Sequence, residues 1–406
     1  SIYTPENPVA SKKGALVTNI AHIPEALTAV MKLNGKDPDF APKGSLSLKS
    51  WFGNNQGLNL PEELDVPVVE AISPYNEQIA ALDKQVGAQY RRETLKDTSG
   101  ASMMDPKTQV SKIHQTSILD ASKKSFEANL VFALCREYPN EYGEKIANIA
   151  LNTYVNQYGQ VTLAAAEAAR ENGNSPNTVV SGAVAIVGKK MVEPAMNASS
   201  ALLNLFQFAK FSDTNSDFDY ADQLQCAKEY KDVLLADSND KFADSLAVCL
   251  SKDTKSVFIK FLLDFAKQES GNPSTDAMIA AIWTTLAWSG MKSKKITKGT
   301  ITRLPWYSRI YSTIVGVSAS SDKHSEDSFC GVKLEELITS FSFTRTAFLS
   351  LMGRGPTDDE LFEFQVLLGL IITNGPGTIS AQGSKGAVSA DGPEMPGRVQ
   401  VNKAFI

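Results

Sequence analysis

Apolar residues recur every three to four positions along most of this chain, a spacing that predicts amphipathic helices. The breaks between these segments carry Gly, Pro, Asn or Ser, which are typical of helix ends. The expected helices cover residues 76–92, 125–137, 143–157, 163–171, 177–187, 197–208, 222–235, 239–250, 256–267, 275–288, 334–352 and 360–372. No convincing alternating strand appears, and the best candidate for a short strand is residues 300–319, TITRLPWYSRIYSTIVGVSA. The pattern as a whole predicts a mainly all-α protein.

The first part of the chain has a different pattern. A short helical spacing at residues 23–33 is followed by stretches rich in Pro, Gly and Asn, such as NGKDPDFAPKGS. Such punctuation is typical of irregular structure. We therefore expect residues 1–88 to form an irregular arm with short helices.

Two segments of the chain look alike. Residues 125–139, SFEANLVFALCREYP, and residues 342–356, SFTRTAFLSLMGRGP, both run from Ser-Phe through an apolar helix to a proline, 217 residues apart (356 − 139). Each is followed by an acidic helix start, a second apolar helix and a turn of small residues, NQYGQVTLAA or TNGPGTISAQ. A tandem repeat explains this order, and helices of similar length also imitate it.

Composition and charge narrow the class of protein. The 406 residues are enough for two or three domains, and 43% hydrophobic with 21% charged residues is typical of a globular protein. A net charge of -5 gives no electrostatic reason to expect nucleic acid. No apolar run reaches the roughly 18 residues of a membrane helix. We expect no nucleic-acid or membrane partner.

The cysteines and histidines give no metal or disulfide pattern. The four cysteines are far apart, without a CxxC pair, and most lie among apolar residues. They are expected to be reduced, buried thiols in a cytoplasmic protein. The three histidines lack the spacing of metal ligands, so no metal is expected. His114 and His324 lie in polar stretches and are expected at the surface.

Residues 336–382, ELITSFSFTRTAFLSLMGRGPTDDELFEFQVLLGLIITNGPGTISAQ, resemble the citrate synthase superfamily, especially the citryl-CoA lyase module of ATP-citrate lyase. The order of helix starts, proline turn, acidic TDDEL start, apolar helix and small-residue loop is the family's. Residues 175–200 of the first copy also resemble a family helix. The resemblance implies a citrate-synthase-like unit at residues 89–304 and the N-terminal half of a second at 305–406.

The resemblance also implies a chemistry. The family enolises an acyl-CoA thioester: a carboxylate takes the α-proton, a histidine stabilises the enolate oxygen, and arginines bind the partner's carboxylates. In the second copy Asn374 takes that histidine's place and could donate to the enolate oxygen. The other residues expected to contact substrate are Gly375, Gly377, Thr378 and Arg354.

The first copy departs further from the family pattern. Gln157 or Tyr158 takes the place of the first histidine, and Met191 or Val192 that of the second. Asp276 is the nearest counterpart of the catalytic carboxylate, and it also reads as an ordinary acid at a helix start. The first copy is therefore expected to be inactive and to act as a scaffold.

Two functions follow from the resemblance. One is an enzyme that forms or cleaves a carbon–carbon bond beside a CoA thioester, with acyl-CoA as its substrate. The other is an inactive structural or regulatory subunit of a larger assembly. Either is expected as a homo-oligomer, or as a hetero-oligomer with a chain that completes the second copy.

Several features also have simpler explanations. The glycines after residue 373 fit no nucleotide-loop motif and could form a close-packed corner instead. The aspartates of residues 211–222 lack the glycine and glutamate of a calcium loop and suggest a solvated loop. Residues 283–288, WTTLAW, suggest core packing. Arg136, Arg345 and Arg354 lie at helix ends, and surface ion pairing is the alternative to anion binding by Arg354.

Overall fold

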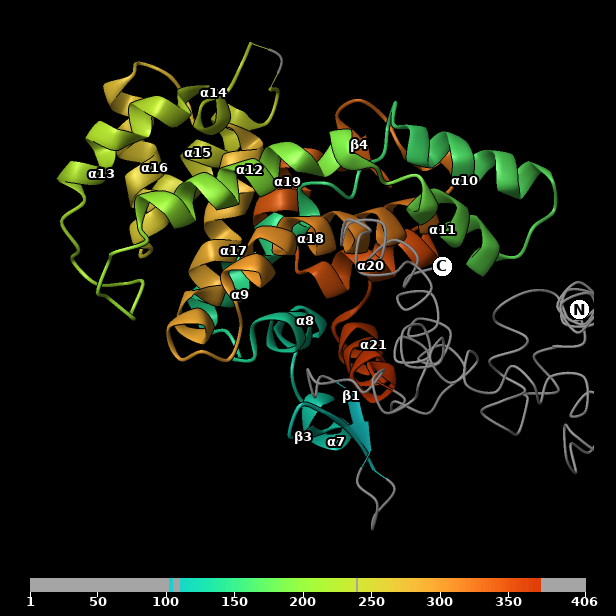
Figure 1. Ribbon diagram of the computed structural model, residues 1–406. Coiled ribbons are helices and arrows are strands. Elements are labelled where there is room, and N and C mark those ends of the chain that lie inside the picture. Colours follow the sequence, from blue (N-terminus) through green and yellow to red (C-terminus); the bar gives the residue numbers. More distant parts are fainter. Residues whose placement is uncertain (1–101, 105–109, 239, 374–406) are drawn as a thin grey trace, which may run out of the picture. The chain divides into compact units, whose positions relative to one another are not determined.

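The protein is mainly all-α. A computed structural model describes residues 102–104, 110–238 and 240–373 (Figure 1). Its elements, in chain order, are β1 Ser102–Met104, β2 Ser111–Ile113, β3 Thr116–Ser117, α7 Ile118–Ala121, α8 Phe126–Cys135, α9 Glu141–Asn152, α10 Val161–Glu171, α11 Pro176–Ala185, α12 Lys189–Leu205, α13 Ala221–Cys226, η4 Ala227–Tyr230, α14 Lys231–Leu234, α15 Ala243–Ser251, α16 Val257–Gln268, α17 Thr275–Lys292, α18 Lys298–Ser318, η5 Ser321–Lys323, β4 Ser328–Phe329, β5 Val332–Lys333, α19 Leu334–Ser340, α20 Phe343–Met352 and α21 Asp358–Ile371.

Most of the predicted helices are confirmed, and capping residues explain where several begin. The side chains of Ser125, Asn140 and Ser274 accept backbone N–H bonds at the starts of α8, α9 and α17. The segment expected as one helix over residues 334–352 is two helices, because Phe341 and Ser342 are extended and Ser342 caps α20. The expected helices at residues 23–33 and 76–92 lie outside the described residues.

The best candidate for a short strand, within residues 300–319, is not a strand, because this segment belongs to helix α18. α18 is packed against α9, α11, α12, α17 and α20. The Ser308 hydroxyl donates to the Ala150 carbonyl over 3.3 Å, and the Ser312 hydroxyl donates to that of Leu151 over 2.5 Å. Burial on several sides outweighs the strand preference of its β-branched and aromatic residues.

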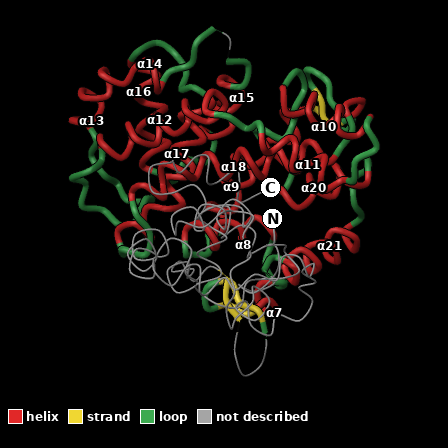
Figure 2. Tube along the Cα trace, turned by 45° about the vertical axis from the view of Figure 1, so that its right-hand side comes forward, coloured by secondary structure: helices red, strands yellow, loops and turns green. Residues whose placement is uncertain are grey.

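The strands are very short and escaped the sequence pattern for that reason. β1, β2 and β3 form an antiparallel three-stranded sheet, and β4 pairs with β5 in a hairpin. With two or three residues each, they do not show a period of two. Figure 2, in which strands are yellow, shows how small a share of the described chain they form.

The core is centred on α17, which packs against α8, α9, α12, α16 and α18. Trp283 and Trp288 are 0% and 1% exposed, so the predicted core packing of residues 283–288 is confirmed. The Trp288 ring stacks on Phe211 at 5.2 Å between centroids, and its indole N–H donates to the Phe211 carbonyl. This aromatic cluster makes α17 the central helix of the described part.

The thiols are only partly as expected. Cys135 is buried, Cys249 and Cys330 are half-buried, and Cys226 is exposed. The prediction of burial is wrong for Cys226 because it ends α13, whose residues all remain accessible. Among the described helices, none combines the length and apolar character that crossing a bilayer requires.

One order of elements occurs twice. The first element series consists of the hairpin β2–β3 and helices α7, α8 and α9; the second consists of β4–β5 and α19, α20 and α21. α8 and α20 each have ten residues, a serine cap, and a left-handed residue, Arg136 or Gly353, directly after the helix. A polar cap, Asn140 or Thr357, then starts α9 or α21 four residues later.

The two series contact each other through like positions. Thr344 donates from its backbone N–H (3.2 Å) and its hydroxyl (2.6 Å) to Oε2 of Glu127, which lies 217 residues earlier. The rings of Phe126 and Phe343, which have the same separation, stack at 6.1 Å. α8 thus packs on α20, α7 on α21 and α9 on α19, and the α7–α21 pair is visible in Figure 1 and Figure 2.

Hydrogen bonds between α9 and α19 and a close approach of α21 to α7 stabilise the contact between the two series. Nδ2 of Asn152 on α9 donates to the carbonyls of Leu337 (3.1 Å) and Phe341 (2.8 Å) at the end of α19. At the matching position of α21, Gly369 lies so close to α7 that a Cβ atom there would be 2.4 Å from Cα of Ser122. The expected boundary between residues 304 and 305 falls within the continuous helix α18, and the expected division into domains stays a prediction.

Candidate functional site

Most of the residues expected to contact substrate cannot be placed. Asn374, Gly375, Gly377 and Thr378 lie outside the described residues, directly after α21. Their roles stay predictions. Arg354 is described, and it lies in the turn between α20 and α21.

Arg354 is exposed and paired with a carboxylate. Its Nη1 and Nη2 atoms donate to Oε2 and Oε1 of Glu360 over 2.8 and 2.5 Å. The Arg354 bonds, with the backbone N–H of Thr357, lower the pKa of Glu360 to about 2. The guanidinium also lies 5.6 Å from the ring of Phe348. Arg354 would have to leave Glu360, or share it, to bind an anionic substrate.

In the first element series, the loop that matches the predicted site is closed by its own hydrogen bonds. The Thr162 hydroxyl donates to Oε1 of Gln157, and the Gln157 side chain donates to the Tyr154 carbonyl, both over 2.5 Å. The backbone N–H of Gln157 donates to Nδ1 of His324 over 3.1 Å. Tyr158 points outward and is 53% exposed.

The expectation that His324 is a surface residue is wrong: it is 6% exposed. Its Nε2 lies 3.1 Å from the Gly316 carbonyl oxygen, to which a neutral ring protonated at Nε2 donates; Nδ1 accepts from the backbone N–H of Gln157 and also lies 2.9 Å from Oδ1 of Asn156. Burial lowers the pKa of His324 and so favours this neutral form. Both ring nitrogens are occupied, and His324 fastens the loop to α18 without a free nitrogen for catalysis.

His114 is also buried, at 8% exposed, and the surface expectation is wrong here too. It has a left-handed backbone (φ 52°) in the turn of the β2–β3 hairpin. Its Nε2 lies 3.0 Å from the Ala133 carbonyl, and its ring packs edge-on against Phe132. This histidine therefore attaches the hairpin to α8.

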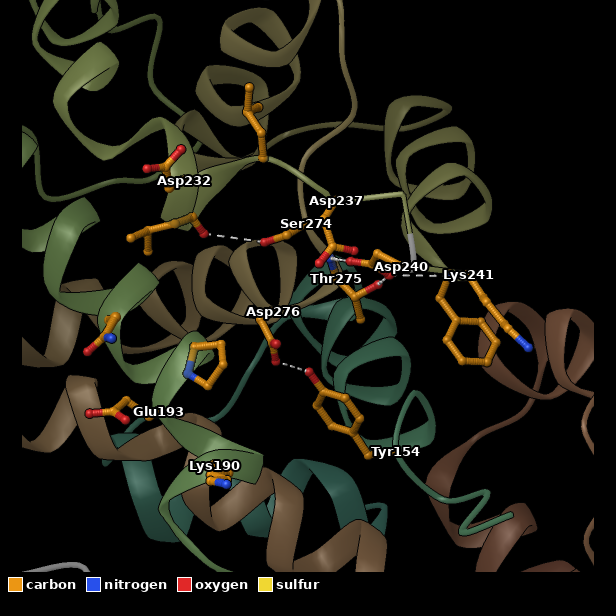
Figure 3. A pocket seen from close by; sticks show the side chains of 15 residues that line it. Tyr154, Lys190, Glu193, Asp232, Asp237, Asp240, Lys241, Ser274, Thr275 and Asp276 are labelled. Carbon is orange, nitrogen blue, oxygen red and sulfur yellow. Dashed lines mark hydrogen bonds between the residues drawn. The ribbon is translucent and has the colours of Figure 1, made fainter. Parts of the chain in front are cut away.

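One cavity of the described residues has a volume of about 860 Å³. It lies between α12, α14, the start of α17 and the segment leading to α15 (Figure 3). The side chains that give it its chemical character are Tyr154, Lys190, Glu193, Asp232, Asp237, Asp240, Lys241, Ser274, Thr275 and Asp276. We call it the acidic cavity.

Tyr154 and Asp276 form the polar pair of this cavity. Figure 3 shows the two side chains pointing toward each other, and the Tyr154 hydroxyl donates to Oδ1 of Asp276. Burial raises the pKa of Asp276, while the bond from Tyr154 and the charge of Arg309 oppose the rise. The Arg309 guanidinium lies 4.1 Å from the centre of the Tyr154 ring, and its buried Nε has no hydrogen-bond partner among the described residues.

Sequence reasoning found Asp276 but missed Tyr154 and Arg309. Asp276 is more than an acid at a helix start, because its carboxyl group is buried at the cavity wall and bonded to a phenol. The sequence feature that could have pointed to Arg309 is its charge within the largely apolar run WYSRIYSTIV. A cation in such a run is rarely buried without a partner.

The acidic cavity is poorly suited to an anion. Five carboxylates line it against the two ammonium groups of Lys190 and Lys241. Lys241 is already paired with Glu326, and Asp240 accepts from the backbone and hydroxyl of Thr275 (2.7 and 2.5 Å). Among the described lining residues there is no histidine to stabilise an enolate oxygen. The net negative charge of this lining therefore disfavours the phosphates of CoA.

The described residues also form no metal-binding site. In residues 110–238 and 240–373, no group of three or more His, Cys, Asp or Glu side chains is arranged to hold a metal ion. Within the loop of residues 211–222, Asp213 and Asp219 accept backbone N–H bonds from Asn215 and Ala221. These carboxylates serve turns of the loop itself.

Comparisons with known proteins identify no family for this chain. No protein-family model matches this chain, and no curated protein matches it. Among solved structures, it is similar to citryl-CoA lyase from Hydrogenobacter thermophilus, with 18% sequence identity and a TM-score of 0.39. The similarity covers 54% of this chain and 84% of that one.

Proposed function

We propose that this protein is citrate-synthase-like and acts on an acyl-CoA thioester, with the first element series as a scaffold for the second. The observation that carries the scaffold part of the proposal is the contact of Glu127 with Thr344 and of Phe126 with Phe343, whereas the activity itself is proposed from the sequence resemblance. Like positions meet when two copies of one unit pair about a two-fold axis. Here both series belong to one chain, so the pairing is internal.

The first series is the structural half in this proposal. Its loop at Gln157 is closed by Thr162 and His324, and both described histidines have structural hydrogen bonds. The acidic cavity would repel the phosphates of CoA, since like charges in a partly buried site are unfavourable. These features support a scaffold.

The second series would then handle the substrate. Asn374 follows α21 where the family has its histidine, and its amide N–H₂ can donate to an enolate oxygen but cannot transfer a proton at neutral pH. A preorganised donor of this kind is worth about 3–4 kcal/mol of barrier. Gly375 and Gly377 would allow backbone to approach the thioester, and Arg354 would bind an anionic group by exchanging Glu360 for it.

The alternative is an inactive structural or regulatory protein. It is favoured by the engagement of both described histidines and by the asparagine at the family's histidine position. The internal pairing supports this alternative equally well. Only a measurement of chemistry separates the two.

The test is exchange of the methyl protons of acetyl-CoA in deuterated water, followed by mass spectrometry. Exchange needs a general base to take the α-proton, and because Asn374 cannot be that base, the proposal requires a carboxylate among the residues that the structure does not describe. With that base we expect the full chain to catalyse exchange and Asn374→Ala to slow it about 100-fold or more, which corresponds to the donor's share of the barrier. Tyr158→Ala is the matched control, because Tyr158 is exposed in the corresponding loop of the first series. Absence of exchange above the rate without protein would favour the inactive alternative.

A further inference from the structure

The turn of residues 157–160, between α9 and α10, is held closed by a histidine far away in sequence. We call it the Gln157 turn. Nδ1 of His324 accepts the backbone N–H of Gln157 over 3.1 Å, and the two residues are 6% and 0% exposed. The Gln157 side chain accepts from the hydroxyl of Thr162 on α10 and donates to the Tyr154 carbonyl. The closed position of the turn therefore depends on Gln157, which His324 holds.

The surroundings of His324 suit two protonation states of its ring. Besides the N–H of Gln157, Nδ1 faces an acceptor, Oδ1 of Asn156, at 2.9 Å. Nδ2 of Asn156 donates to the Ser325 carbonyl over 2.7 Å, which keeps the amide oxygen toward the ring. Nε2 faces a second acceptor, the Gly316 carbonyl oxygen, at 3.1 Å. A neutral ring can donate to only one of these two oxygens, whereas an imidazolium donates to both.

A protonated ring cannot keep its bond with Gln157. Once Nδ1 carries a proton, its N–H faces the backbone N–H of Gln157, and two donors do not bond each other. The ring still has a partner on this side, because Nδ1–H can donate to Oδ1 of Asn156. Protonation thus exchanges the backbone N–H of Gln157 for the side-chain oxygen of Asn156.

The Gln157 turn has room to move, while the chain just before it is fixed. Val155 is 0% exposed, and its carbonyl oxygen lies so close to α18 that a Cβ atom at Gly316 would be 2.0 Å from it. Within the turn, Tyr158 is 53% exposed. Gly159 has a left-handed backbone (φ 69°), and a Cβ atom there would meet nothing within 4 Å. Opening is therefore local to residues 157–160.

The charged groups that face His324 come from α10 and from the segment just before it. Burial lowers the pKa of His324; the Gly316 carbonyl opposes this, Arg170 lowers the pKa further, and Glu167 and Asp322 raise it. Residues 153–160, the α18 residues 310–318 and β4 contribute no carboxylate or cation. Since the pKa lies below 6.5, the ring is neutral at pH 7 and protonates as the pH falls below 6.5.

We propose that His324 is a pH-sensitive switch: its neutral ring holds the Gln157 turn closed, and a proton taken up from solvent at Nδ1 moves the ring's bond to Asn156 and opens the turn. Gln157 also holds the carbonyl of Tyr154, which lines the acidic cavity. Opening of the turn therefore loosens the segment that places Tyr154 at the cavity wall. The switch is independent of any activity on acyl-CoA.

Amide hydrogen exchange of the full chain, followed by mass spectrometry and corrected for the intrinsic pH dependence of exchange, tests the switch. We expect protection of residues 157–160 to fall at least about tenfold between pH 7.5 and 5, because each pH unit below the pKa raises the ratio of protonated to neutral ring tenfold. Protection of α17 should stay constant. Constant protection of residues 157–160, or an equal fall in α17, would overturn the proposal.

Three variants assign the effect to His324. In His324→Gln an amide that does not titrate can accept from Gln157 and donate to Gly316, so protection should no longer depend on pH. His114→Gln is the matched control, because His114 is also buried but lies in the β2–β3 hairpin, and here the fall should remain. Asn156→Asp should move the midpoint up by about one pH unit, since a carboxylate favours the imidazolium. An unchanged fall in His324→Gln would contradict the switch, as would its loss in His114→Gln.

NMR of the unsubstituted chain decides the question if His324→Gln fails to fold. The ring resonances of His324 and the backbone amide of Gln157 should shift with one common midpoint below pH 6.5. Two different midpoints, or a titration of His324 that leaves the Gln157 amide unchanged, would overturn the proposal.

Discussion

The Glu127–Thr344 contact offers the sharpest test of internal pairing. Both residues are buried, at 1% and 2% exposed, and Thr344 donates two hydrogen bonds to one carboxylate oxygen. Thr344→Val keeps the side-chain shape and removes the hydroxyl donor. Leaving a buried acceptor without one of its donors costs about 1–3 kcal/mol, so we expect the free energy of unfolding to fall by about 2 kcal/mol.

The neutral variant Glu127→Gln makes the measurement specific. It retains an oxygen acceptor for Thr344 and cannot ionise. The Thr344 bond to an amide oxygen is a neutral hydrogen bond, so in this background Thr344→Val should lower stability by only about 1 kcal/mol. The difference between the effects of Thr344→Val on stability in these two backgrounds is the interaction energy between Glu127 and Thr344.

Urea denaturation followed by tryptophan fluorescence measures these changes at pH 7. Thr178→Val, at an exposed threonine of α11, should change stability by less than about 0.5 kcal/mol. If Thr344→Val has an equally small effect, or the same effect with Glu127→Gln, the two series are not coupled through this contact.

The titration of Glu127 also makes the free energy of unfolding depend on pH. Burial raises its pKa above the ordinary value of 4.5, against the hydrogen bonds from Thr344. The folded state then holds the proton more tightly than the unfolded chain, so this contribution to stability is lost as pH rises from 4.5 through the raised pKa. Glu127→Gln should abolish that part of the pH dependence.

Three further predictions concern the scaffold. Gly316→Ala should destabilise the protein by about 3 kcal/mol in urea denaturation, because its Cβ would collide with the Val155 carbonyl; a change below 1 kcal/mol would mean that α18 can move. For His324, burial lowers the pKa below 6.5, so stability should fall as pH falls below 6.5, and His324→Gln should remove that loss in melts between pH 5 and 7. Asp232→Asn with Asp237→Asn in the acidic cavity should leave acetyl-CoA affinity unchanged in calorimetry, whereas a tenfold gain would place CoA in that cavity.

The sequence predicted helices well where the apolar spacing and caps agreed. Ser125, Asn140 and Ser274 are polar residues directly before apolar runs, and they cap α8, α9 and α17. α18 was missed because its β-branched and aromatic residues favour a strand locally, and only packing on several sides makes the segment helical.

The site was harder to predict because its contacts are distant in sequence. His324 bonds Gln157 across 167 residues, and Tyr154 bonds Asp276 across 122. A polar stretch around a histidine suggests solvent exposure, yet His324 is buried because the loop it fastens lies over it. The offset of 217 residues, by contrast, was readable from two Ser-Phe helices, and the structure places Glu127 and Thr344 in contact at that separation.

Titration of acetyl-CoA into the full chain by calorimetry tests the central claim most directly. The account predicts saturable binding that is retained in Asp232→Asn and is weakened in Arg354→Ala, because the thioester is held by the second series. Absence of any binding heat at millimolar acetyl-CoA, with the protein shown to be folded, would contradict it.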